Sequence, residues 1–461
     1  MVELAGKNVL VVGLGKSGVA AARLLAGRGA RVIGNDLRAE DELAPEARTL
    51  PEAGVELVLG AHDSELFARM DVIVVSPGVP NLPALTAAER AGVRIASEIE
   101  LASWFVRGTT IGITGTNGKS TVTTLVGQMC ARSGRPTFVG GNLGTPLVDV
   151  VGTPAAERGG YVVVELSSFQ LERVDQLHLH GAALLNVTED HLDRYPSFAA
   201  YADAKAAVFH NQSAEDFAVV PSGDEFCAQL AARGNARIHR YAGDDGEVRI
   251  EAGALIDRDS GLNVPVAEIR LFGHHNLENA CASALLARLA GVAPAAIAET
   301  LRAFTGLPHR MCHVRTLDEV DYYDDSKATN VGATAAALDG LADRKGRVVL
   351  LAGGKDKGGD YAPMVERMRR IGRSTVLIGE AAGLIERALS AAGLSSERAS
   401  SLEQAVELAQ QLARPGDVVL LAPACGSFDM FRSYSHRGDV FQTAVHELEA
   451  RTGMHLKPGA E

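Results

Sequence analysis

Short runs of Val, Ile and Leu alternate along the chain with longer stretches that are rich in Ala and Leu. Runs of this kind, bounded by turn residues, indicate strands that are buried on both faces, with helices between them. This pattern predicts strands at residues 8–12, 71–75, 110–114, 161–164, 182–185, 347–351 and 417–421. The alternation therefore predicts an α/β fold with mostly parallel sheets covered by helices on both faces.

Three of these strands run directly into glycine-rich turns. The turns are GLGKSG at 13–18, GTNGKST at 115–121 and GGKDKGG at 353–359. Because such sheets bind ligands at the carboxyl ends of their strands, we expect the three turns to carry binding sites. Residues 242–265, which are rich in Gly and Asp, are instead expected to form hairpins or surface loops.

Composition and charge limit the class of protein. The chain has 461 residues, 46% of them apolar and 22% charged, as in globular proteins of two to four domains. A net charge of 45 − 57 = −12 argues against binding of a nucleic-acid backbone, which needs clustered Lys and Arg. The five scattered cysteines form no C-x-x-C motif, and no apolar run is long enough to span a membrane. We therefore expect a reduced, cytoplasmic protein without a membrane segment.

The first glycine-rich turn fits the G-x-G-x-x-G pattern between a strand and a helix, with Asp36 at the end of the next predicted strand. The glycines allow a pyrophosphate to approach the backbone, and the helix N-terminus supplies amide donors. An acidic residue at this distance binds ribose hydroxyls. This window leaves three alternatives open: a nicotinamide or flavin site, a site for another nucleotide diphosphate, and a structural turn.

The second turn has the Lys-Ser pair that a nucleoside triphosphate requires. Its backbone amides would surround the β-phosphate, Lys119 would neutralise β- and γ-phosphate oxygens, and Ser120 or Thr121 would bind Mg²⁺. Ile113 stands where the strict P-loop has its first glycine, so the loop is a shortened variant. With the first turn, this predicts two separate nucleotide sites.

Further polar residues follow the predicted strands. Glu165 suits a Mg²⁺ site, although an acid at a helix N-terminus is an alternative. Residues 186–193 could bind a second hard cation or form a capped loop. Lys205 lies on a helix predicted at 198–210, where a lone lysine is expected to be solvated. Ordinary turn chemistry would explain each of the polar clusters at 307–310, 324–330 and 427–431 singly.

Taken together, these segments resemble the Mur ligase family over nearly the whole chain. The short P-loop also occurs in folylpolyglutamate synthases, but the ordered set of motifs is far more specific. The set comprises GLGKSG, SPGVP, GTNGKST, VELSSFQL, LNVTEDHLDRY with a lysine ten residues past its tyrosine, GHHNLEN, GLPHRM, DDSKATN, and ACGSFDMF followed by RG.

The resemblance implies three domains. We expect a Rossmann-like domain that binds the UDP-sugar at 1–98, a central P-loop ATPase-like domain at 99–306 and a Rossmann-like domain that binds the amino acid at 307–461. The implied activity is an ATP-dependent amide ligase of cytoplasmic peptidoglycan precursor synthesis. It would add D-glutamate to UDP-N-acetylmuramoyl-L-alanine through an acyl phosphate, releasing ADP and phosphate.

The resemblance also implies cofactors, partners and roles for individual residues. ATP is expected as a substrate, with two Mg²⁺ ions and a carbamylated Lys205, in a monomer without nucleic-acid or membrane partners. The implied catalytic residues are Lys119, His191 and Lys205. The implied UDP-substrate residues are Gly13, Gly15, Ser17, Gly18, Asp36, Gly78, Asn142 and Ser167. The implied ATP residues are Gly115, Thr116, Asn117, Gly118, Lys119, Ser120, Thr121, Asn276, Asn279, Arg310 and Asp325. The implied D-glutamate residues are Lys327, Thr329, Lys357, Ser427, Phe428 and Tyr434, and the implied metal ligands are Ser120, Glu165, His191 and Lys205.

Two positions depart from the family pattern. Lys355 stands in the third turn where relatives carry Asp, and the aromatic residue that packs on D-glutamate appears as Tyr434. Three alternatives therefore accompany the main hypothesis: another Mur or folylpolyglutamate-type ligase, a Rossmann redox protein that binds NAD, and a nucleotide sensor without catalysis.

Overall fold

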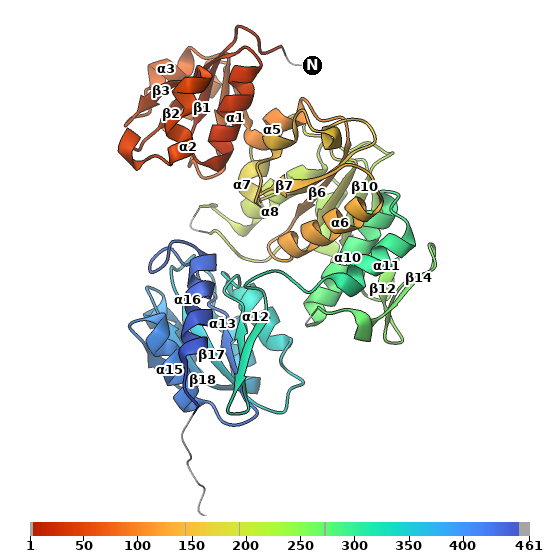
Figure 1. The fold of residues 1–461 in the computed structure, drawn as a ribbon, viewed down its shortest axis with the longest axis vertical. Helices are drawn as coiled ribbons and strands as arrows, with labels where there is room; N and C mark the ends of the chain where they lie inside the picture. The colour runs from red at the N-terminus through yellow and green to blue at the C-terminus, as the bar shows by residue number, and fades with distance from the viewer. Residues whose placement is uncertain (1–2, 143, 193, 272, 451–461) are drawn as a thin grey trace, which may run out of the picture. The chain divides into compact units, whose positions relative to one another are not determined.

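The computed structural model describes residues 3–142, 144–192, 194–271 and 273–450 (Figure 1). The chain forms two compact units. The first comprises Met1–Val187, Ala199–Ile269 and Glu278–Phe304, and the second comprises Thr188–Phe198, Arg270–Leu277 and Thr305–Glu461. Among the helices of the described ranges, none is both long enough and apolar enough to cross a membrane.

The N-terminal part of the first unit is a parallel sheet with strand order β3-β2-β1-β4-β5. Its elements are β1 (Asn8–Val12), α1 (Lys16–Gly27), β2 (Arg31–Asp36), α2 (Pro45–Arg48), β3 (Glu56–Leu59), α3 (Ser64–Ala68), β4 (Val72–Val75), α4 (Pro83–Arg90) and β5 (Arg94–Ser97). Alternate residues of β1 face opposite cores: Val9 and Val11 pack with α1, whereas Leu10 and Val12 pack with α3 and α4. This two-sided burial explains the continuous apolar run, and the reversal of strand order beside β1 places a ligand crevice at its carboxyl end.

The remainder of the first unit is a larger sheet with strand order β14-β13-β12-β11-β10-β9-β6-β8-β7. Its elements are α5 (Glu98–Ser103), β6 (Thr109–Thr114), α6 (Lys119–Arg132), β7 (Thr137–Gly141), β8 (Tyr161–Glu165), α7 (Ser168–Leu171), β9 (Gly181–Leu184), α8 (Phe198–Ala206), β10 (Phe217–Pro221), α9 (Glu225–Ala231), β11 (Arg237–Tyr241), β12 (Val248–Glu251), β13 (Ala254–Asp257), β14 (Leu262–Pro265), α10 (His274–Leu289) and α11 (Pro294–Ala303). Strands β12, β13 and β14 pair antiparallel. This confirms the hairpins expected in 242–265. The other neighbouring strands of this part, in the order β11-β10-β9-β6-β8-β7, pair in parallel.

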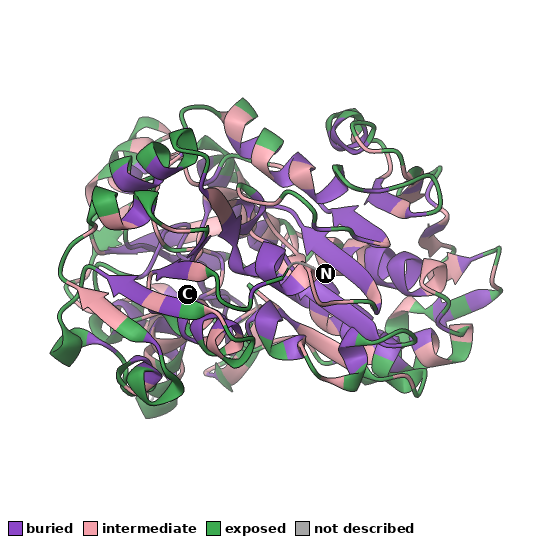
Figure 2. Cartoon of the chain, turned by 90° about the horizontal axis from the view of Figure 1, so that it is seen from above, coloured by how far each residue is buried: buried purple, intermediate pink, exposed green. Residues whose placement is uncertain are grey.

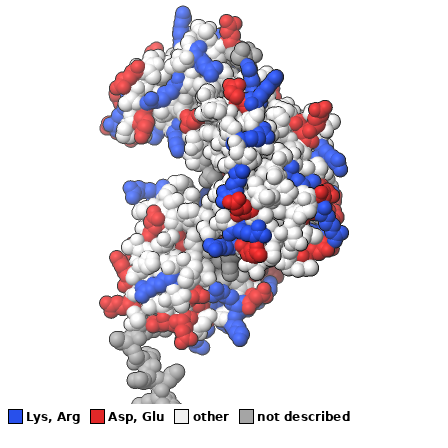
Figure 3. Space-filling model, turned by 45° about the vertical axis from the view of Figure 1, so that its right-hand side comes forward, with Lys and Arg blue, Asp and Glu red and all other residues white. Residues whose placement is uncertain are grey.

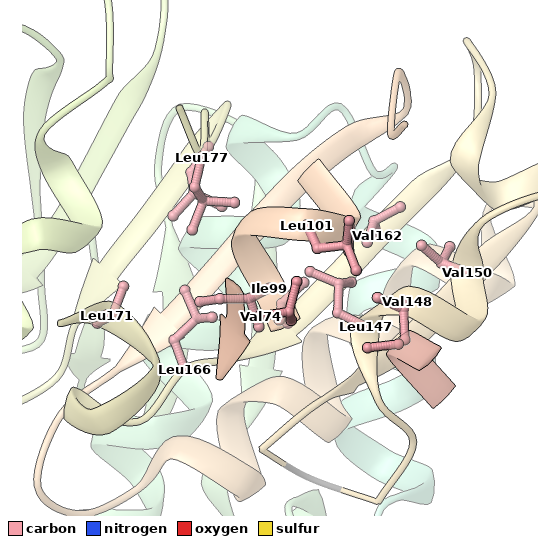
Figure 4. Packing of buried hydrophobic residues seen from close by; sticks show 14 of the residues in the cluster. Val74, Ile99, Leu101, Leu147, Val148, Val150, Val162, Leu166, Leu171 and Leu177 are labelled. Carbon is pink, nitrogen blue, oxygen red and sulfur yellow. The ribbon is translucent and has the colours of Figure 1, made fainter. Parts of the chain in front are cut away.

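A shared core joins the two sheets of the first unit. Ile99 and Leu101 of α5 pack in one cluster with Val74 of the first sheet and Val162 of the second (Figure 4). The buried carboxylate of Glu100 adds polar links, because it accepts hydrogen bonds from three consecutive backbone amides at 175–177, each 3.0 Å long. The two sheets are therefore held together by apolar packing, and the buried charge of Glu100 is satisfied by the segment before β9.

The second unit contains a sheet with strand order β15-β16-β20-β17-β18-β19, in which β15 is antiparallel and the other strands are parallel. Its elements are β15 (Cys312–Leu317), β16 (Val320–Asp324), α12 (Val331–Asp339), β17 (Val348–Gly353), α13 (Ala362–Ile371), β18 (Gly372–Ile378), α14 (Ala382–Ala391), β19 (Ser396–Arg398), α15 (Leu402–Leu412), β20 (Val418–Leu421) and α16 (Tyr434–Glu447). Figure 2 shows the buried residues concentrated in the strands and the exposed residues in loops and outer helix faces. The α/β class with mostly parallel sheets is confirmed.

The predicted strands all exist, and their ends differ from the prediction by at most two residues. Two predictions around Lys205 were wrong. The predicted helix at 198–210 ends as an α-helix at Ala206 and continues as a 3-10 turn, Ala207–Phe209. Lys205 itself is buried, with only 1% of its surface exposed, rather than solvated. Burial depends on which helix face meets the sheet, and α8 has little amphipathic pattern to reveal that face.

Candidate active site

The loop between β1 and α1 depends on two of its glycines. Gly13 has a φ of 86°, a left-handed conformation that favours glycine. A Cβ atom on Gly18 would lie 1.9 Å from the carbonyl oxygen of Gly13, so a side chain cannot fit there. A Cβ on Gly15 would meet no atom within 4 Å. Gly13 and Gly18 therefore shape the turn, and Gly15 leaves open space beside it.

A cavity of ≈ 530 Å³ lies beside this loop. Its lining residues come from the loops after β1, β2, β3, β4 and β7, from the start of α1 and from α7. They include, among the predicted UDP-substrate residues, Gly13, Gly15, Ser17, Asp36, Gly78 and Asn142. Gly18 and Ser167 are not lining residues; Ser167 caps α7 by accepting a hydrogen bond from the amide of Gln170, which does line the cavity.

Asp36 is already engaged within the protein. One carboxylate oxygen accepts the amide of Leu14 at 2.7 Å, and the Arg38 guanidinium donates to both oxygens, at 3.0 and 2.7 Å. Burial alone would raise the pKa of Asp36, but the hydrogen bonds from Arg38 and Leu14 and the charge of Arg38 lower it to about 2. The carboxylate is therefore ionised at neutral pH and fixes the β2 end of the cavity.

The loop geometry predicts different effects for two substitutions of the same kind. Gly18→Ala should lower the free energy of unfolding by about 1–3 kcal/mol, because its methyl group collides with the Gly13 carbonyl. Gly15→Ala should leave folding stability unchanged but weaken nucleotide binding, because its methyl group enters open space. Denaturant unfolding and UDP titration of both variants measure this difference; equal stability of the two variants would contradict it.

Hydrogen bonds join the loop between β6 and α6 to Asn186, which follows β9. Asn186 accepts a hydrogen bond from the amide of Asn117 at 2.8 Å, and its own amide donates back to the Asn117 carbonyl at 3.2 Å. Gly118 has a φ of 85°, and a Cβ there would lie 2.5 Å from Oδ1 of Asn279. The side chain of Asn279 therefore lies against the loop. Ser120 and Thr121 are buried at the start of α6.

Two lysines converge on one carbonyl group of this loop. Nζ of Lys119 donates to the carbonyls of Gly115 and Thr116, both at 2.8 Å. Nζ of Lys205 donates to the same Gly115 carbonyl at 2.8 Å and lies 4.5 Å from the ring centroid of Tyr201. Tyr201 in turn lies 3.2 Å from the Thr116 hydroxyl. The fold therefore brings the Nζ atoms of Lys119 and Lys205 to one carbonyl group of the phosphate-type turn.

Glu165 ends β8 beside this loop, and its two carboxylate oxygens differ in their hydrogen bonding. Its Oε1 accepts a hydrogen bond from Asn142 at 2.6 Å, whereas the buried Oε2 has no hydrogen-bond partner in the described part of the chain. An unpartnered buried carboxylate oxygen fits a hard cation such as Mg²⁺. The described residues contain no cluster of three His, Cys, Asp or Glu side chains that could hold a metal.

In the second unit, Asp190 is the centre of a charged cluster. Nζ of Lys357 lies 3.2 Å from one carboxylate oxygen of Asp190, and the side-chain amide of Asn330 donates to the other at 3.1 Å. His191, which has a φ of 56°, places its Nε2 3.7 Å from the same carboxylate. Although burial alone would raise the pKa of Asp190, the charges of Lys357 and His191 keep it below its ordinary value.

The second unit also holds three of the predicted ATP residues, Asn276, Arg310 and Asp325. Burial raises the pKa of Asp325 to about 7, despite the opposing charge of Arg310 and a 3.3 Å hydrogen bond from the Met311 amide. Such a carboxyl group is held close to its protonation point, a condition common in functional sites.

The predicted D-glutamate residues come mainly from two loops of the second unit, after β16 and after β20. The Lys327 ammonium lies 4.1 Å from the ring centroid of Tyr434, and Ser427 is buried. Thr329 is half-buried, whereas the Phe428 side chain is 75% exposed.

Arg437, which is fully buried, links these two loops. It donates to the hydroxyl and carbonyl of Ser326, at 3.0 and 2.8 Å, and to the carbonyls of Cys425 and Gly426, at 3.2 and 3.1 Å. The five donors of a guanidinium group can hold both loops at once.

Three protein-family models match successive segments of the chain. The model for the Mur ligase MurD-like N-terminal domain matches residues 7–97, that for the Mur ligase middle domain matches 113–287, and that for the Mur ligase glutamate ligase domain matches 309–425. The chain belongs to the Mur ligase family. The three matched segments coincide with the three sheets of the structure.

Similar Mur ligases are known at high sequence identity. UDP-N-acetylmuramoylalanine--D-glutamate ligase of Geobacter metallireducens is 47% identical over 97% of this chain and 98% of its own length. The enzyme of the same name from Myxococcus xanthus is 44% identical over 96% of this chain and 99% of its own.

Solved structures share the fold at lower identity. A pseudomurein peptide ligase type C from Methanothermus fervidus has a TM-score of 0.62 at 18% identity, covering 96% of this chain and 100% of its own. UDP-N-acetylmuramate-alanine ligase MurC from Thermotoga maritima has a TM-score of 0.57 at 19% identity, with the same coverage. The three-domain α/β fold predicted from the motifs is therefore that of the family.

Sequence reasoning missed several residues that the structure brings to these sites. Arg38 lies two positions after Asp36, and Lys16 lies inside the first glycine-rich turn, so their positions in the motifs were a usable signal. Asn186 and Asp190 belong to the polar segment 186–193 but received no individual role. Arg437 belongs to the motif set as the Arg of the RG that follows ACGSFDMF, but it also received no individual role.

Proposed function

We propose that this Mur ligase joins D-glutamate to UDP-N-acetylmuramoyl-L-alanine, using ATP and releasing ADP and phosphate. The observation that carries the proposal is 47% identity over 97% of the chain to a ligase named for this reaction. The two phosphate-type loops of the first unit support it, because a nicotinamide redox protein would not need the second loop. We further propose that the enzyme acts as a monomer in the cytoplasm, in the synthesis of peptidoglycan precursors.

We assign the substrates to domains at 1–98 for the UDP-sugar, 99–306 for ATP and 307–461 for D-glutamate. The site residues implied by the family resemblance keep their proposed roles within these domains. The cavity beside Gly15 is large enough to accept a nucleotide, since small-molecule sites range from about 300 to 1,000 Å³.

In the first step, an oxygen of the L-alanine carboxylate attacks the γ-phosphorus of ATP. The bond to the β,γ-bridging oxygen breaks, ADP leaves, and an acyl phosphate forms. Lys119 exchanges its two carbonyl partners for β- and γ-phosphate oxygens and neutralises the charge that develops on them. The amides at the start of α6 bind the same phosphates.

Two residues of the first unit could hold Mg²⁺: Glu165 offers its unpartnered Oε2, and Ser120 its hydroxyl. The family resemblance implies His191 as a further ligand. When bound, Mg²⁺ supplies positive charge that stabilises phosphoryl transfer. We propose two such ions, with Lys205 carbamylated so that its side chain becomes an anionic oxygen donor.

In the second step, the neutral amine of D-glutamate attacks the acyl carbon, phosphate leaves, and the nitrogen loses a proton. Lys327 and Lys357 bind the two carboxylates of glutamate, because ammonium groups act as point charges toward anions. His191 stabilises the negative oxygen of the tetrahedral intermediate. Lys357 is paired with Asp190 in the structure. The incoming glutamate carboxylate therefore either binds Lys357 together with Asp190 or takes the place of Asp190.

One assay tests the proposal: the protein is supplied with ATP, Mg²⁺, UDP-N-acetylmuramoyl-L-alanine and single amino acids from a panel. We expect phosphate and UDP-linked product with D-glutamate only, and no phosphate without the UDP-sugar. Product with another amino acid would select a different Mur or folylpolyglutamate-type ligase. A change in NAD(P)H absorbance would select the redox alternative, and nucleotide binding without product would select a sensor.

A further inference from the structure

Lys16 reaches across the cavity of the first unit from the N-terminus of α1. Its ammonium group donates a 2.5 Å hydrogen bond to the carbonyl of Gly144, in the loop that follows β7. Both residues line the cavity, and Lys16 is exposed. The two sides of the cavity are therefore joined by a flexible cation bound to a neutral acceptor.

The other charged groups that line this cavity are already balanced. The guanidinium of Arg38 pairs with both oxygens of Asp36. Burial lowers the pKa of His62, against the opposing charge of Asp36, so this ring is neutral at pH 7. Asp149 does not line the cavity, although the charge of Lys16 acts on it and opposes the rise in its pKa that burial causes. Lys16 therefore carries the positive charge that the cavity can offer to an anion.

The surroundings of Lys16 suit a diphosphate. α1 has twelve residues, no acidic residue in its first turn and no side-chain cap on its N-terminal amides. Gly15, immediately before it, has no atom within 4 Å of the place where a Cβ would stand. Open space, free amide donors and an unbalanced ammonium group thus meet at one end of the cavity.

We infer that Lys16 binds the diphosphate of the nucleotide substrate, exchanging the Gly144 carbonyl for phosphate oxygens when that substrate enters the cavity. The inference rests on the proposed function, because it takes the cavity as the uridine nucleotide site. A doubly charged anion attracts an ammonium group more strongly than a carbonyl does, so the exchange is favourable. Lys16 then selects diphosphates over nucleosides.

The test compares UDP with uridine on the full-length protein by isothermal titration calorimetry. Lys16→Met should weaken UDP binding by about 10- to 100-fold and leave uridine binding unchanged, while Lys16→Arg should retain most of the affinity. Lys7→Met is the matched control, because Lys7 is exposed and pairs with Asp71 outside the cavity. Thermal unfolding should be the same for all the variants. In the ligase assay, the KM for the UDP-sugar should rise while the KM for ATP stays constant.

The outcomes separate the two proposals. If the wild-type protein binds UDP and Lys16→Met binds it equally well, the role of Lys16 is overturned and the proposed function stands. If the wild-type protein binds no UDP and makes no UDP-linked product, the proposed function fails and the inference fails with it. If Lys16→Met and Lys7→Met weaken UDP binding equally, the loss is due to general surface charge, and this result would also overturn the inference.

Discussion

Replacing Lys119 by alanine should lower ATP-dependent phosphate release by about 10²- to 10³-fold, because the loop loses the cation that faces the transferred phosphoryl group. The loop itself should survive, since the bonds between Asn186 and Asn117 do not involve Lys119. Single-turnover phosphate release measures the effect, and UDP titration of the same variant measures the first cavity.

UDP affinity is the internal control for Lys119→Ala. The first cavity is lined by other loops, so its affinity for UDP should stay within about twofold of the wild type. Loss of both phosphate release and UDP binding would contradict the assignment of two separate nucleotide sites. Retention of phosphate release would contradict the role of Lys119.

Replacing Lys205 by alanine should also reduce ligase activity by about 10²-fold or more, with partial recovery in acetate or formate. The physical reason is the position of Lys205, buried with its Nζ on the Gly115 carbonyl. A small carboxylate can enter the space left by the side chain and replace a carbamate, which is also an anionic oxygen donor. Activity measured against formate concentration tests this prediction.

Two controls accompany the Lys205 experiment. Lys119→Ala should show no recovery in formate, because it lacks a cation rather than an anion. A ¹³C NMR signal from ¹³CO₂ bound to the wild-type protein should disappear in Lys205→Ala. Absence of both the rescue and the signal would contradict carbamylation, and thermal unfolding of Lys205→Met would show how much of the loss is structural.

Strands, turns and loop chemistry were predictable because they follow from local patterns. Val9 to Val12 are apolar without interruption because both faces of β1 are covered, and this run alone indicated a buried strand. Gly13 and Gly18 were recognisable because backbone geometry and crowding at the turn exclude side chains there. These signals need no knowledge of distant residues.

The partners of the charged residues were not predictable from the sequence. Lys119 and Lys205 are 86 positions apart and share one carbonyl, and Lys357 meets Asp190 across 167 positions. Arg437 is buried only because Ser326 and Gly426 present their carbonyl oxygens to it. Long-range pairs of this kind depend on strand order and helix placement, which local patterns do not encode.

The sequence by itself determined the α/β class, the strands, the glycine-rich turns and the resemblance to a family of ligases. These features depend on periodicity and on backbone conformation, which neighbouring residues fix. The tertiary structure alone decided that Lys205 is buried, that Asp36 is neutralised by Arg38, and that Lys16 joins the two sides of a cavity. A charged side chain acquires its role from the groups around it, and folding brings those groups together from distant segments. On the face in Figure 3, Lys and Arg are interspersed with Asp and Glu, so the net charge of −12 does not reveal where single cations face a cavity.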